Sequence, residues 1–429
     1  MSKQFERSIS VWQGMALYTG AVVGSGILIL PGMTAGVAGN NALLSWLGMV
    51  VLSIPLAFTF AILAREFPSA GGVSTFVEKA FGRYMGALIG WFYFMAAAAG
   101  QFIVPLTGGI YVAYAYHLPS WAAFVTASAL LMGAVTSNYF GLRTSGKVQV
   151  AVSGLVIFIL LSVIILAIPH IGAVHLTPKE PLRHLSSIGA GAMMIFWSFF
   201  GWEAITSLAP EFKNPERDIV RSTIGALVIV GVLYLGIAGA VVGTHAYSSG
   251  VTTLGKAMNS ASLAQVMSQF VGSSGGKFTA ILALLICLGT TNAFVASISR
   301  LAYSLSHERL APSWLDSIDE HRATPQRAVL LVGALAGAGL ALTGVLHLGM
   351  NQLVYIPNSL GIATYVMGTA AGVKLLTSWT GKAASGIACV LCISAYPFVG
   401  AAIWIPVTVG AACALYVSLR GQHERRSLH

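Results

Sequence analysis

The sequence predicts an all-α integral membrane protein whose chain crosses the bilayer twelve times. Charged residues make up 8% of the 429 positions, apolar residues make up 56%, and the mean hydropathy is +0.80. Soluble domains carry roughly a quarter charged residues, so this composition excludes a water-soluble globule. The apolar residues suffice for about twelve helices of ~20 residues each. Little chain remains for a soluble catalytic, ATP-binding or nucleic-acid-binding domain.

Clusters of proline, glycine and charge mark the ends of the predicted spans. The spans are placed at residues 9–38, 42–65, 84–116, 120–138, 148–169, 187–210, 222–243, 276–305, 328–347, 352–373, 383–399 and 402–419. Only Pro397 and Gly400 separate the last two spans, so this boundary has the weakest sequence signal.

Positive charge is distributed unevenly between the two sides of this arrangement. Lys179, Arg183, Lys256 and Lys277 fall in segments on one side, and all the other lysines and arginines share the side of both termini. Cationic loops are retained in the cytoplasm. Both termini are therefore predicted to be cytoplasmic.

Two spans carry sequences that disfavour a continuous helix. Span 1 contains Gly24 and Gly26 on either side of Ser25, span 6 contains Gly201, and a proline follows in each case. Glycine costs up to about 1 kcal/mol in a helix relative to alanine, and proline removes a backbone hydrogen bond. Taken alone, each pattern also suits an ordinary packing notch in a membrane helix.

The two patterns lie five spans apart, which indicates an internal repeat. A five-span unit that is repeated once is inverted, and inverted-repeat transporters build their substrate sites from interrupted helices at corresponding positions. Bare N–H groups at the start of a half-helix bind an anion, and free carbonyls at the end of one accept a cation. A zwitterion such as an amino acid needs both groups, although a sodium ion or a neutral polar solute also fits.

One acidic residue lies well inside a span. Glu203 follows Gly201 by two positions, whereas the other acidic residues fall in loops, tails or span ends. A charge at this depth costs at least about 2.5 kcal/mol, so the carboxyl is expected to exchange a proton. Glu203 is a candidate for coupling transport to protons or for holding the span 6 interruption open. The alternative is a permanently neutral carboxyl hydrogen-bonded between helices.

The middle of the predicted spans contains no lysine or arginine. A charged substrate side chain would find no partner there, so the sequence favours a neutral and mainly apolar one. Trp197, Phe199, Phe200 and Trp202 can supply an aromatic wall. The four cysteines lie in apolar runs without a histidine cluster, so no metal site, cofactor or catalytic residue is predicted.

Residues 211–218 follow span 6 on the predicted cytoplasmic side and mix acidic with basic side chains. They form either a solvated turn or an intracellular gate whose ion pairs break when the inner vestibule opens. On the opposite side, residues 250–275 are expected to include a short surface helix.

Four motifs together resemble the amino acid–polyamine–organocation (APC) superfamily. They are Gly-Ser-Gly-Ile at 24–27, Pro-Ser-Ala-Gly-Gly-Val at 68–73, Phe-Gly-Trp-Glu-Ala at 200–204 and Glu-Phe-Lys-Asn-Pro-Glu-Arg-Asp at 211–218. Within the superfamily, residues 38–41 and 208–218 look most like the bacterial amino-acid exporter branch, which includes the L-methionine/branched-chain amino acid exporter. The resemblance runs over essentially the whole chain, and it implies a location in the plasma (inner) membrane of a bacterium.

The resemblance implies the LeuT-like (APC) fold, a 5+5 inverted repeat with discontinuous helices 1 and 6. The transport core would cover residues 1–373, with one repeat at about 9–169 and the other at about 187–373. Two additional helices would cover 383–419, followed by a cytoplasmic tail at 420–429.

The resemblance also assigns residues to the substrate. The backbone N–H groups at the span 1 interruption would bind the substrate carboxylate, and the carbonyls at both interruptions would bind its ammonium. The residues of this site are Val22, Gly24, Ser25, Gly26, Ile27, Trp197, Ser198, Phe200 and Gly201, with Trp197 and Trp202 as the gate.

Three other residues, Gln101, Thr290 and Asn292, are weaker candidates for lining the site. Some proton-coupled relatives carry a lysine within span 5, where this chain has Gly-Leu-Val-Ile at 154–157. This departure makes coupling through that lysine improbable and shifts attention to Glu203.

These observations predict a secondary transporter that exports neutral L-amino acids (methionine, leucine, isoleucine and valine) by proton-coupled alternating access. The alternative is proton-coupled uptake or amino-acid exchange, because direction depends on gradients. A membrane enzyme is disfavoured because the sequence has neither an HExxH motif nor paired intramembrane acids. A channel is disfavoured by the asymmetric interrupted helices. The expected partners are the amino acid, a proton and the lipid bilayer, without nucleic acid or cofactor.

Overall fold

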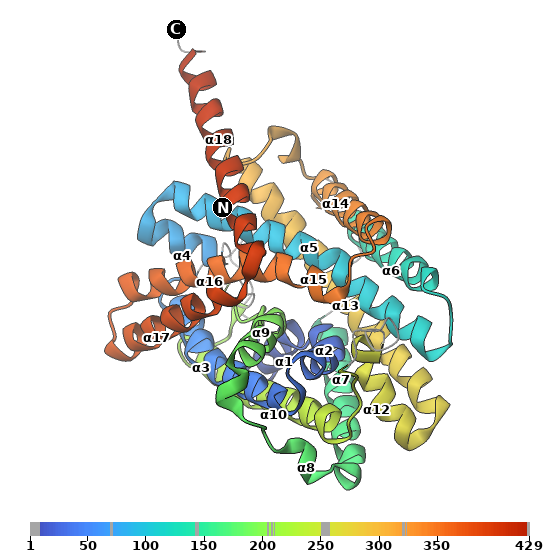
Figure 1. Ribbon diagram of the computed structural model, residues 1–429. Helices are drawn as coiled ribbons and strands as arrows, with labels where there is room; N and C mark the ends of the chain where they lie inside the picture. The colour runs from blue at the N-terminus through green and yellow to red at the C-terminus, as the bar shows by residue number, and fades with distance from the viewer. Residues whose placement is uncertain are drawn as a thin grey trace.

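The computed structural model describes residues 9–68, 72–141, 146–203, 206, 209, 211–249, 258–319, 322 and 324–426. Within these ranges the chain is helical (Figure 1), and β-type pairing is confined to two isolated bridges, Ile9 with Phe212 and Asp319 with Thr324. The all-helical part of the predicted fold class is therefore confirmed.

A helix or a pair of helices lies in each of the twelve predicted segments. In the first half these are α1 (Val11–Val22), α2 (Gly26–Ala38), α3 (Ala42–Glu66), α5 (Arg83–Ala115), α6 (Trp121–Tyr139) and α7 (Gly146–Ala167). In the second half they are α9 (Leu185–Ile195), α10 (Pro215–Gly243), α13 (Ser273–His307), α14 (Gln326–Val345), α16 (Tyr355–Leu375), α17 (Trp379–Ala395) and α18 (Trp404–Arg426).

Shorter helices connect these elements. They are α4 (Gly72–Phe81), α8 (Ala173–Leu176), α12 (Ser262–Val271) and α15 (Met350–Leu353). The helix α12 lies within the segment 250–275 that was predicted to carry a surface helix, and residues 250–257 of that segment lie outside the described ranges.

Among the described residues, 8 helical stretches are long and apolar enough to cross a membrane. They are Gly26–Glu66, Arg83–Ala115, Trp121–Tyr139, Val150–His170, Pro215–Gly243, Ser273–His307, Gln326–Val345 and Trp379–Phe398. Large apolar side chains such as Phe158 on α7 and Val390 on α17 are two-thirds exposed, as expected for helices that face lipid. The number twelve remains a prediction.

The helix predicted for span 1 is interrupted where its glycines fall. The first half, α1, ends at Val22, and the second half, α2, begins at Gly26. Two tight local hydrogen bonds close the end of α1, from the Val23 amide to the Thr19 carbonyl (2.7 Å) and from the Gly24 amide to the Val22 carbonyl (2.8 Å).

Span 6 is also interrupted. The helix α9 continues as a 3₁₀ turn, η4 (Phe196–Phe199), and Phe200 then takes an extended conformation with ψ 134°. Gly201 follows with φ +131°, and a Cβ atom added to it would lie 2.8 Å from the carbonyl carbon of Ala21. Both the positive φ angle and the close approach to Ala21 favour glycine at position 201. Because of this close approach, the two interruptions are packed backbone to backbone.

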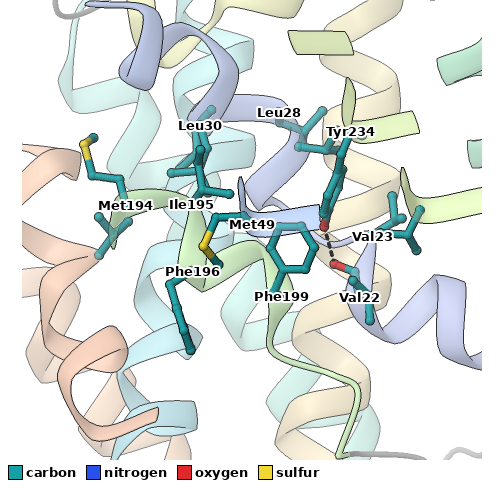
Figure 2. Packing of buried hydrophobic residues seen from close by; sticks show 14 of the residues in the cluster. Val22, Val23, Leu28, Leu30, Met49, Met194, Ile195, Phe196, Phe199 and Tyr234 are labelled. Atoms are coloured by element: carbon teal, nitrogen blue, oxygen red, sulfur yellow. Dashed lines mark hydrogen bonds between the residues drawn. The ribbon is translucent and has the colours of Figure 1, made fainter. Parts of the chain in front are cut away.

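The interruptions are enclosed by a continuous core. Figure 2 shows Val22 of span 1 beside Phe199 of span 6 and Tyr234 of α10, within one cluster of buried residues that also includes Val23 and Phe196. The long helix α5 packs against α4, α6, α13, α14 and α16 and forms the opposite wall (Figure 1). A hydrogen bond from the Tyr111 hydroxyl to the Leu28 carbonyl (2.5 Å) ties α5 to the second half of span 1.

Candidate binding site at the interrupted helices

A cavity of about 50 Å³ lies between the two interruptions and the helices α5, α13 and α16. A space of this size holds several water molecules. Its lining consists of Ala21, Val22, Gly24, Ser25 and Gly26 from span 1, Tyr93, Ala96, Ala97, Gly100, Gln101 and Val104 from α5, Trp197, Ser198, Phe200 and Glu203 from span 6, Thr290 and Phe294 from α13, and Gly361, Thr364 and Tyr365 from α16.

Most of the residues that were predicted for the site meet at this cavity. Those that line it are Val22, Gly24, Ser25, Gly26, Gln101, Trp197, Ser198, Phe200, Glu203 and Thr290. Ile27, which follows Gly26, is fully buried and does not line the cavity. Gly201 does not line it either, but its backbone amide donates a hydrogen bond to Glu203. The remaining candidates, Trp202 and Asn292, lie elsewhere.

Trp202 and Asn292 do not contact the cavity. The Trp202 ring is buried against Tyr18 of α1, with the ring centroids 5.9 Å apart. The carbonyl oxygen of the Asn292 side chain accepts a hydrogen bond from Asn138 on α6 (2.9 Å). Both side chains therefore serve packing between helices in this conformation.

Three backbone amides at the span 1 interruption have no hydrogen-bond acceptor in the described part of the chain. They belong to Ser25, Gly26 and Ile27, and the next amide, of Leu28, donates to the Ser25 carbonyl (3.1 Å). These amides form the start of α2, where the helix dipole adds partial positive charge. The arrangement suits an anionic group such as a carboxylate.

The carbonyl groups at both interruptions are held by Tyr234 of α10. Its hydroxyl lies 2.8 Å from the Val22 carbonyl oxygen and 2.7 Å from the Ser198 carbonyl oxygen. The Val22 carbonyl also accepts the Gly24 amide (2.8 Å), which uses both of its lone pairs, whereas the Ser198 carbonyl keeps a lone pair for a ligand. The sequence analysis did not identify Tyr234, because one tyrosine in an apolar span carries no local signal.

Glu203 is buried, with 3% of its surface exposed, and its two carboxyl oxygens differ in their contacts. Oε2 accepts a hydrogen bond from the Gly201 amide (3.0 Å) and another from the Tyr365 hydroxyl. Oε1 has no hydrogen-bond partner among the described residues, although Tyr93 of α5 lies beside the carboxyl. The Tyr365 hydroxyl also lies 3.1 Å from the Phe199 carbonyl oxygen, so it connects the carboxyl to the span 6 interruption.

The cavity wall contains several buried polar atoms without partners in the described ranges. They are Ser25 Oγ, Gln101 Oε1, Ser198 Oγ and Glu203 Oε1. Buried polar atoms are rarely left unsatisfied in proteins, and each costs roughly 1–3 kcal/mol when it is. A polar ligand or ordered water at this position would satisfy them.

The rest of the wall is apolar and closely fitted. A Cβ atom on Gly100 would lie 2.7 Å from the Trp197 ring, and one on Gly361 would lie 1.9 Å from the Phe200 ring. The two glycines therefore create the space that these aromatic rings occupy. Among the lining residues, Glu203 is the only one of the acidic or basic residue types. Tyr93, Tyr365 and Gly361 were not predicted, because only the packing of distant helices brings them to the site.

The segment 211–218, which was predicted to form either a solvated turn or an intracellular gate, contacts the start of span 1. Within the described residues, no ion pair forms in the segment 211–218. Instead, the Ile9 amide donates to the Glu211 carbonyl (3.0 Å) and the Lys213 amide donates to the Ile9 carbonyl (3.0 Å). A backbone pairing thus fastens the start of span 1 to the segment after span 6.

Comparison with known proteins gives consistent matches along the chain. A family model described as amino acid permease matches residues 9–419. The uncharacterized amino acid permease YecA of Bacillus subtilis is 34% identical over 433 residues, covering 100% of both chains. The L-methionine/branched-chain amino acid exporter YjeH of Escherichia coli is 29% identical, covering 86% of this chain and 87% of the exporter. The serine/threonine exchanger SteT of Bacillus subtilis is 25% identical, covering 77% of this chain and 76% of the exchanger.

Proposed function

The chain belongs to the amino acid permease family, and we propose that it exports neutral, mainly apolar L-amino acids by proton-coupled alternating access. Family membership makes it a multi-pass membrane transporter of amino acids rather than an enzyme. The proposed substrates are methionine, leucine, isoleucine and valine. The exporter YjeH, which covers most of this chain, supports this choice.

The observation that carries the proposal is the set of acceptor-free amides of Ser25, Gly26 and Ile27. They stand at the start of α2, beside a cavity that also offers the unpartnered Glu203 Oε1 and Gln101 Oε1. In the proposed complex, the amides bind the substrate carboxylate and these oxygens receive its ammonium, together with the carbonyl of Ser198. A zwitterion satisfies both sets at once.

The side-chain preference follows from the remaining wall. Alanine, valine and aromatic residues line this part of the cavity, without lysine, arginine or aspartate. A charged substrate side chain would lose its hydration without gaining a counter-ion, which is costly in an apolar environment. An apolar side chain gains about 25 cal/mol for each Å² of surface that it buries.

Proton coupling is assigned to Glu203. Its carboxyl is buried and lines the cavity, and Gly201 and Tyr365 hold Oε2 while Oε1 has no partner in the described residues. A proton on Oε1 would turn that atom from an acceptor of the substrate ammonium into a hydroxyl donor. Binding of a proton and binding of the ammonium would then compete, as proton–amino acid antiport requires.

The structural framework of the proposal is the inverted repeat. We place repeat 1 at about 9–169 and repeat 2 at about 187–373, with 383–419 as two additional spans and both termini in the cytoplasm. The interruptions at Val23–Ser25 and at Phe200–Gly201 support it, because they stand five spans apart and meet at one cavity.

A second candidate is amino-acid exchange. The serine/threonine exchanger SteT aligns with 77% of this chain, which favours testing this mode. Exchange needs an amino acid on both sides of the membrane, whereas proton-driven export needs only a pH gradient. The two modes are therefore separable in one assay.

The test is a proteoliposome assay with labelled methionine, leucine, alanine, lysine and glutamate, each with and without a pH gradient. We expect saturable transport of methionine and leucine that an imposed pH gradient drives against the concentration gradient. Preference for lysine or glutamate would contradict the neutral substrate class. Transport that needs internal amino acid and ignores the pH gradient would favour exchange.

A further inference from the structure

Basic and aromatic side chains occur at the ends of α4 and α16 and at the starts of α5 and α17, which follow them in the chain. We define it as the basic–aromatic patch, formed by Lys79, Phe81, Tyr84, Lys374, Trp379 and Lys382. The helix α4 packs against α5 and α16, and α16 packs against α17. The Lys374 ammonium lies 5.2 Å from the centroid of the Phe81 ring and so joins α16 to α4.

The three lysines of the patch carry positive charge without acidic partners. In the described parts of the chain, none of them lies within ion-pair distance of a carboxylate. Lys79 is placed over an aromatic ring as well, 4.9 Å from the centroid of Phe67. Packing over a ring leaves the ammonium group with donors to spare, because the ring supplies no hydrogen-bonding oxygen.

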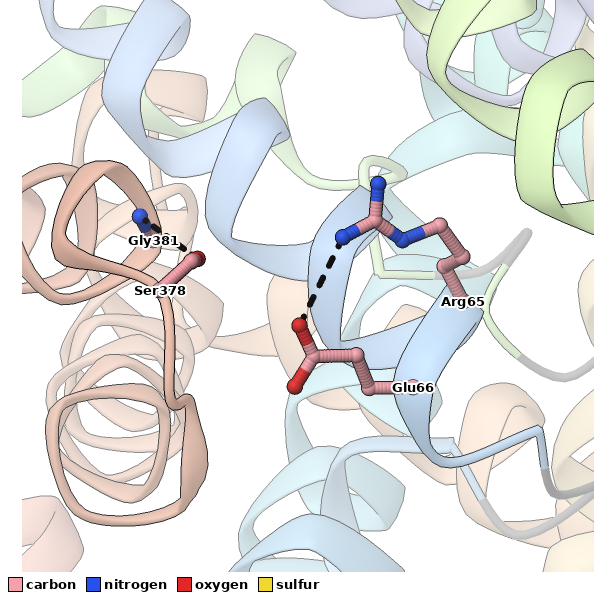
Figure 3. Close-up of polar contacts among 4 residues, drawn as sticks. All are labelled: Arg65, Glu66, Ser378 and Gly381. Carbon is pink, nitrogen blue, oxygen red and sulfur yellow. Dashed lines mark hydrogen bonds and ion pairs between the residues drawn. The ribbon is translucent and has the colours of Figure 1, made fainter.

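Two acidic residues lie on α3 and α4, next to the start of the patch along the chain. Glu66, at the end of α3, is paired with Arg65 (3.5 Å), and Figure 3 shows this pair facing the start of α17 at Ser378 and Gly381. Glu78 is exposed on α4. With Glu66 neutralised by Arg65, the three lysines outweigh Glu78, so the net charge of the patch is positive.

The aromatic members of the patch are unusually exposed. The exposed fraction is 82% for Trp379, 70% for Tyr84 and 38% for Phe81. Tryptophan and tyrosine at the ends of membrane helices sit at the level of the lipid headgroups. Lysine side chains beside them place their charge at the same level. The patch therefore has the chemistry of a headgroup contact and not of a packed interior.

We propose that the basic–aromatic patch is a binding site for an anionic phospholipid. The ammonium groups of Lys374, Lys382 and Lys79 contact the headgroup phosphate, and the rings of Trp379 and Tyr84 contact the glycerol and the upper acyl chains. Charge complementarity selects an anionic over a zwitterionic headgroup. The exposed rings select a lipid over a free phosphate ion, which has no apolar part to cover them.

The test uses the full chain in a neutral detergent, with phosphatidylglycerol and phosphatidylcholine as probes. Native mass spectrometry counts the bound lipids and gives apparent affinities, and thermal unfolding gives the shift in midpoint. We expect phosphatidylglycerol to bind and to raise the midpoint more than phosphatidylcholine. In K374Q/K382Q, its affinity should fall by roughly 30-fold, the loss expected for two cations at an anionic surface.

The matched control is K179Q/K277Q. Lys277 also lies over a ring, 5.7 Å from the centroid of Tyr116, but at the opposite end of α5 from Tyr84. Lys179 pairs through its backbone amide with Asn41, at the opposite end of α3 from Glu66. This control should bind phosphatidylglycerol as the unaltered protein does.

Three outcomes would overturn the proposal. The first is unchanged lipid binding by K374Q/K382Q, and the second is an equal loss in the control. The third is an equal thermal shift with inorganic phosphate or glycerol 3-phosphate, which would show a simple anion site. Both lysines are exposed, so folding of the variant is expected. The single variants K374Q and K382Q provide the same readout if the double variant fails to fold.

Discussion

The hydroxyl of Tyr234 lies 2.8 Å from the carbonyl oxygen of Val22, and it reaches the carbonyl of Ser198 as well. Figure 2 shows the hydrogen bond to Val22, and with the contact to Ser198 one side chain from α10 joins the interruption of span 1 to that of span 6. The substrate groups proposed for these two segments depend on their relative position. Tyr234 is therefore a positioning residue for both.

The substitution Y234F tests this role. Phenylalanine keeps the ring in its contacts with Trp46 and Phe199 but removes the hydroxyl. The hydroxyl has one proton to donate and the Val22 carbonyl keeps the Gly24 amide as a donor, so the loss removes the equivalent of one hydrogen bond, which costs roughly 1–3 kcal/mol. We expect at least tenfold weaker methionine binding with a smaller change in thermal stability. Equilibrium binding and thermal unfolding on the same preparation check this, and equal affinity of the two proteins would contradict it.

The substitution G26A tests the anion site. A Cβ atom at position 26 would lie 2.0 Å from Ser198 Oγ and would push the two interruptions apart. Binding of labelled methionine should fall by tenfold or more while the protein still folds. The control G48A adds a methyl group on α3 where nothing lies within 4 Å. If G26A kept its affinity for methionine, the substrate carboxylate would not bind at the start of α2.

The substitution E203Q tests proton coupling. Glutamine keeps the shape and the hydrogen bonds at one oxygen but cannot exchange a proton at neutral pH. Transport driven by a pH gradient should be lost, whereas exchange of external for internal methionine should continue. The pH profile of exchange should become flat. If E203Q kept the pH profile of the unaltered protein, Glu203 would not couple transport to protons and its role would be structural.

Two histidines mark positions where stability can be gained. His117 and His347 follow the ends of α5 and α14 with φ 53° and φ 50°, a region that glycine adopts without strain. The left-handed conformation costs other residues roughly 1–2 kcal/mol. H347G should raise the midpoint of thermal unfolding by about 1–3 °C. H170G should lower it, because His170 stacks on Phe270 with ring centroids 4.1 Å apart.

Glu211 gives a stability effect that depends on pH. Partial burial raises the pKa of its carboxyl above the ordinary value of 4.5. The folded protein then disfavours the charged form, so stability is full below pH 4.5 and falls as pH rises through the folded-state pKa. E211Q should unfold at a higher temperature than the unaltered protein at pH 8, and the difference should shrink near pH 4.5. A difference that is independent of pH would contradict this cause.

The positions of the two interruptions could be predicted because their causes are local. Glycines 24, 26 and 201 weaken a helix wherever they occur, and the structure interrupts both helices there. The location of charged residues at the ends of the predicted spans can likewise be seen in the sequence alone. These signals also located the cavity, since unsatisfied backbone must face a ligand or solvent.

The other residues of the site could not be predicted from local sequence. Tyr234, Tyr365 and Tyr93 reach it from three different helices, and only the packing of those helices brings them together. The side-chain direction of Trp202 was also inaccessible. The helix ends before Phe200, so helical periodicity cannot predict the direction of the Trp202 side chain, which packs against α1 and not into the cavity.

The pairing of Ile9 with Glu211 and Lys213 has a mechanical consequence for transport. Two hydrogen bonds of 3.0 Å, one donated by the Ile9 amide and one accepted by the Ile9 carbonyl, link the start of span 1 to the segment that follows span 6. In the proposed transport cycle, a tilt of one segment would therefore be transmitted to the other, and the two interrupted spans would move together at this end of the protein.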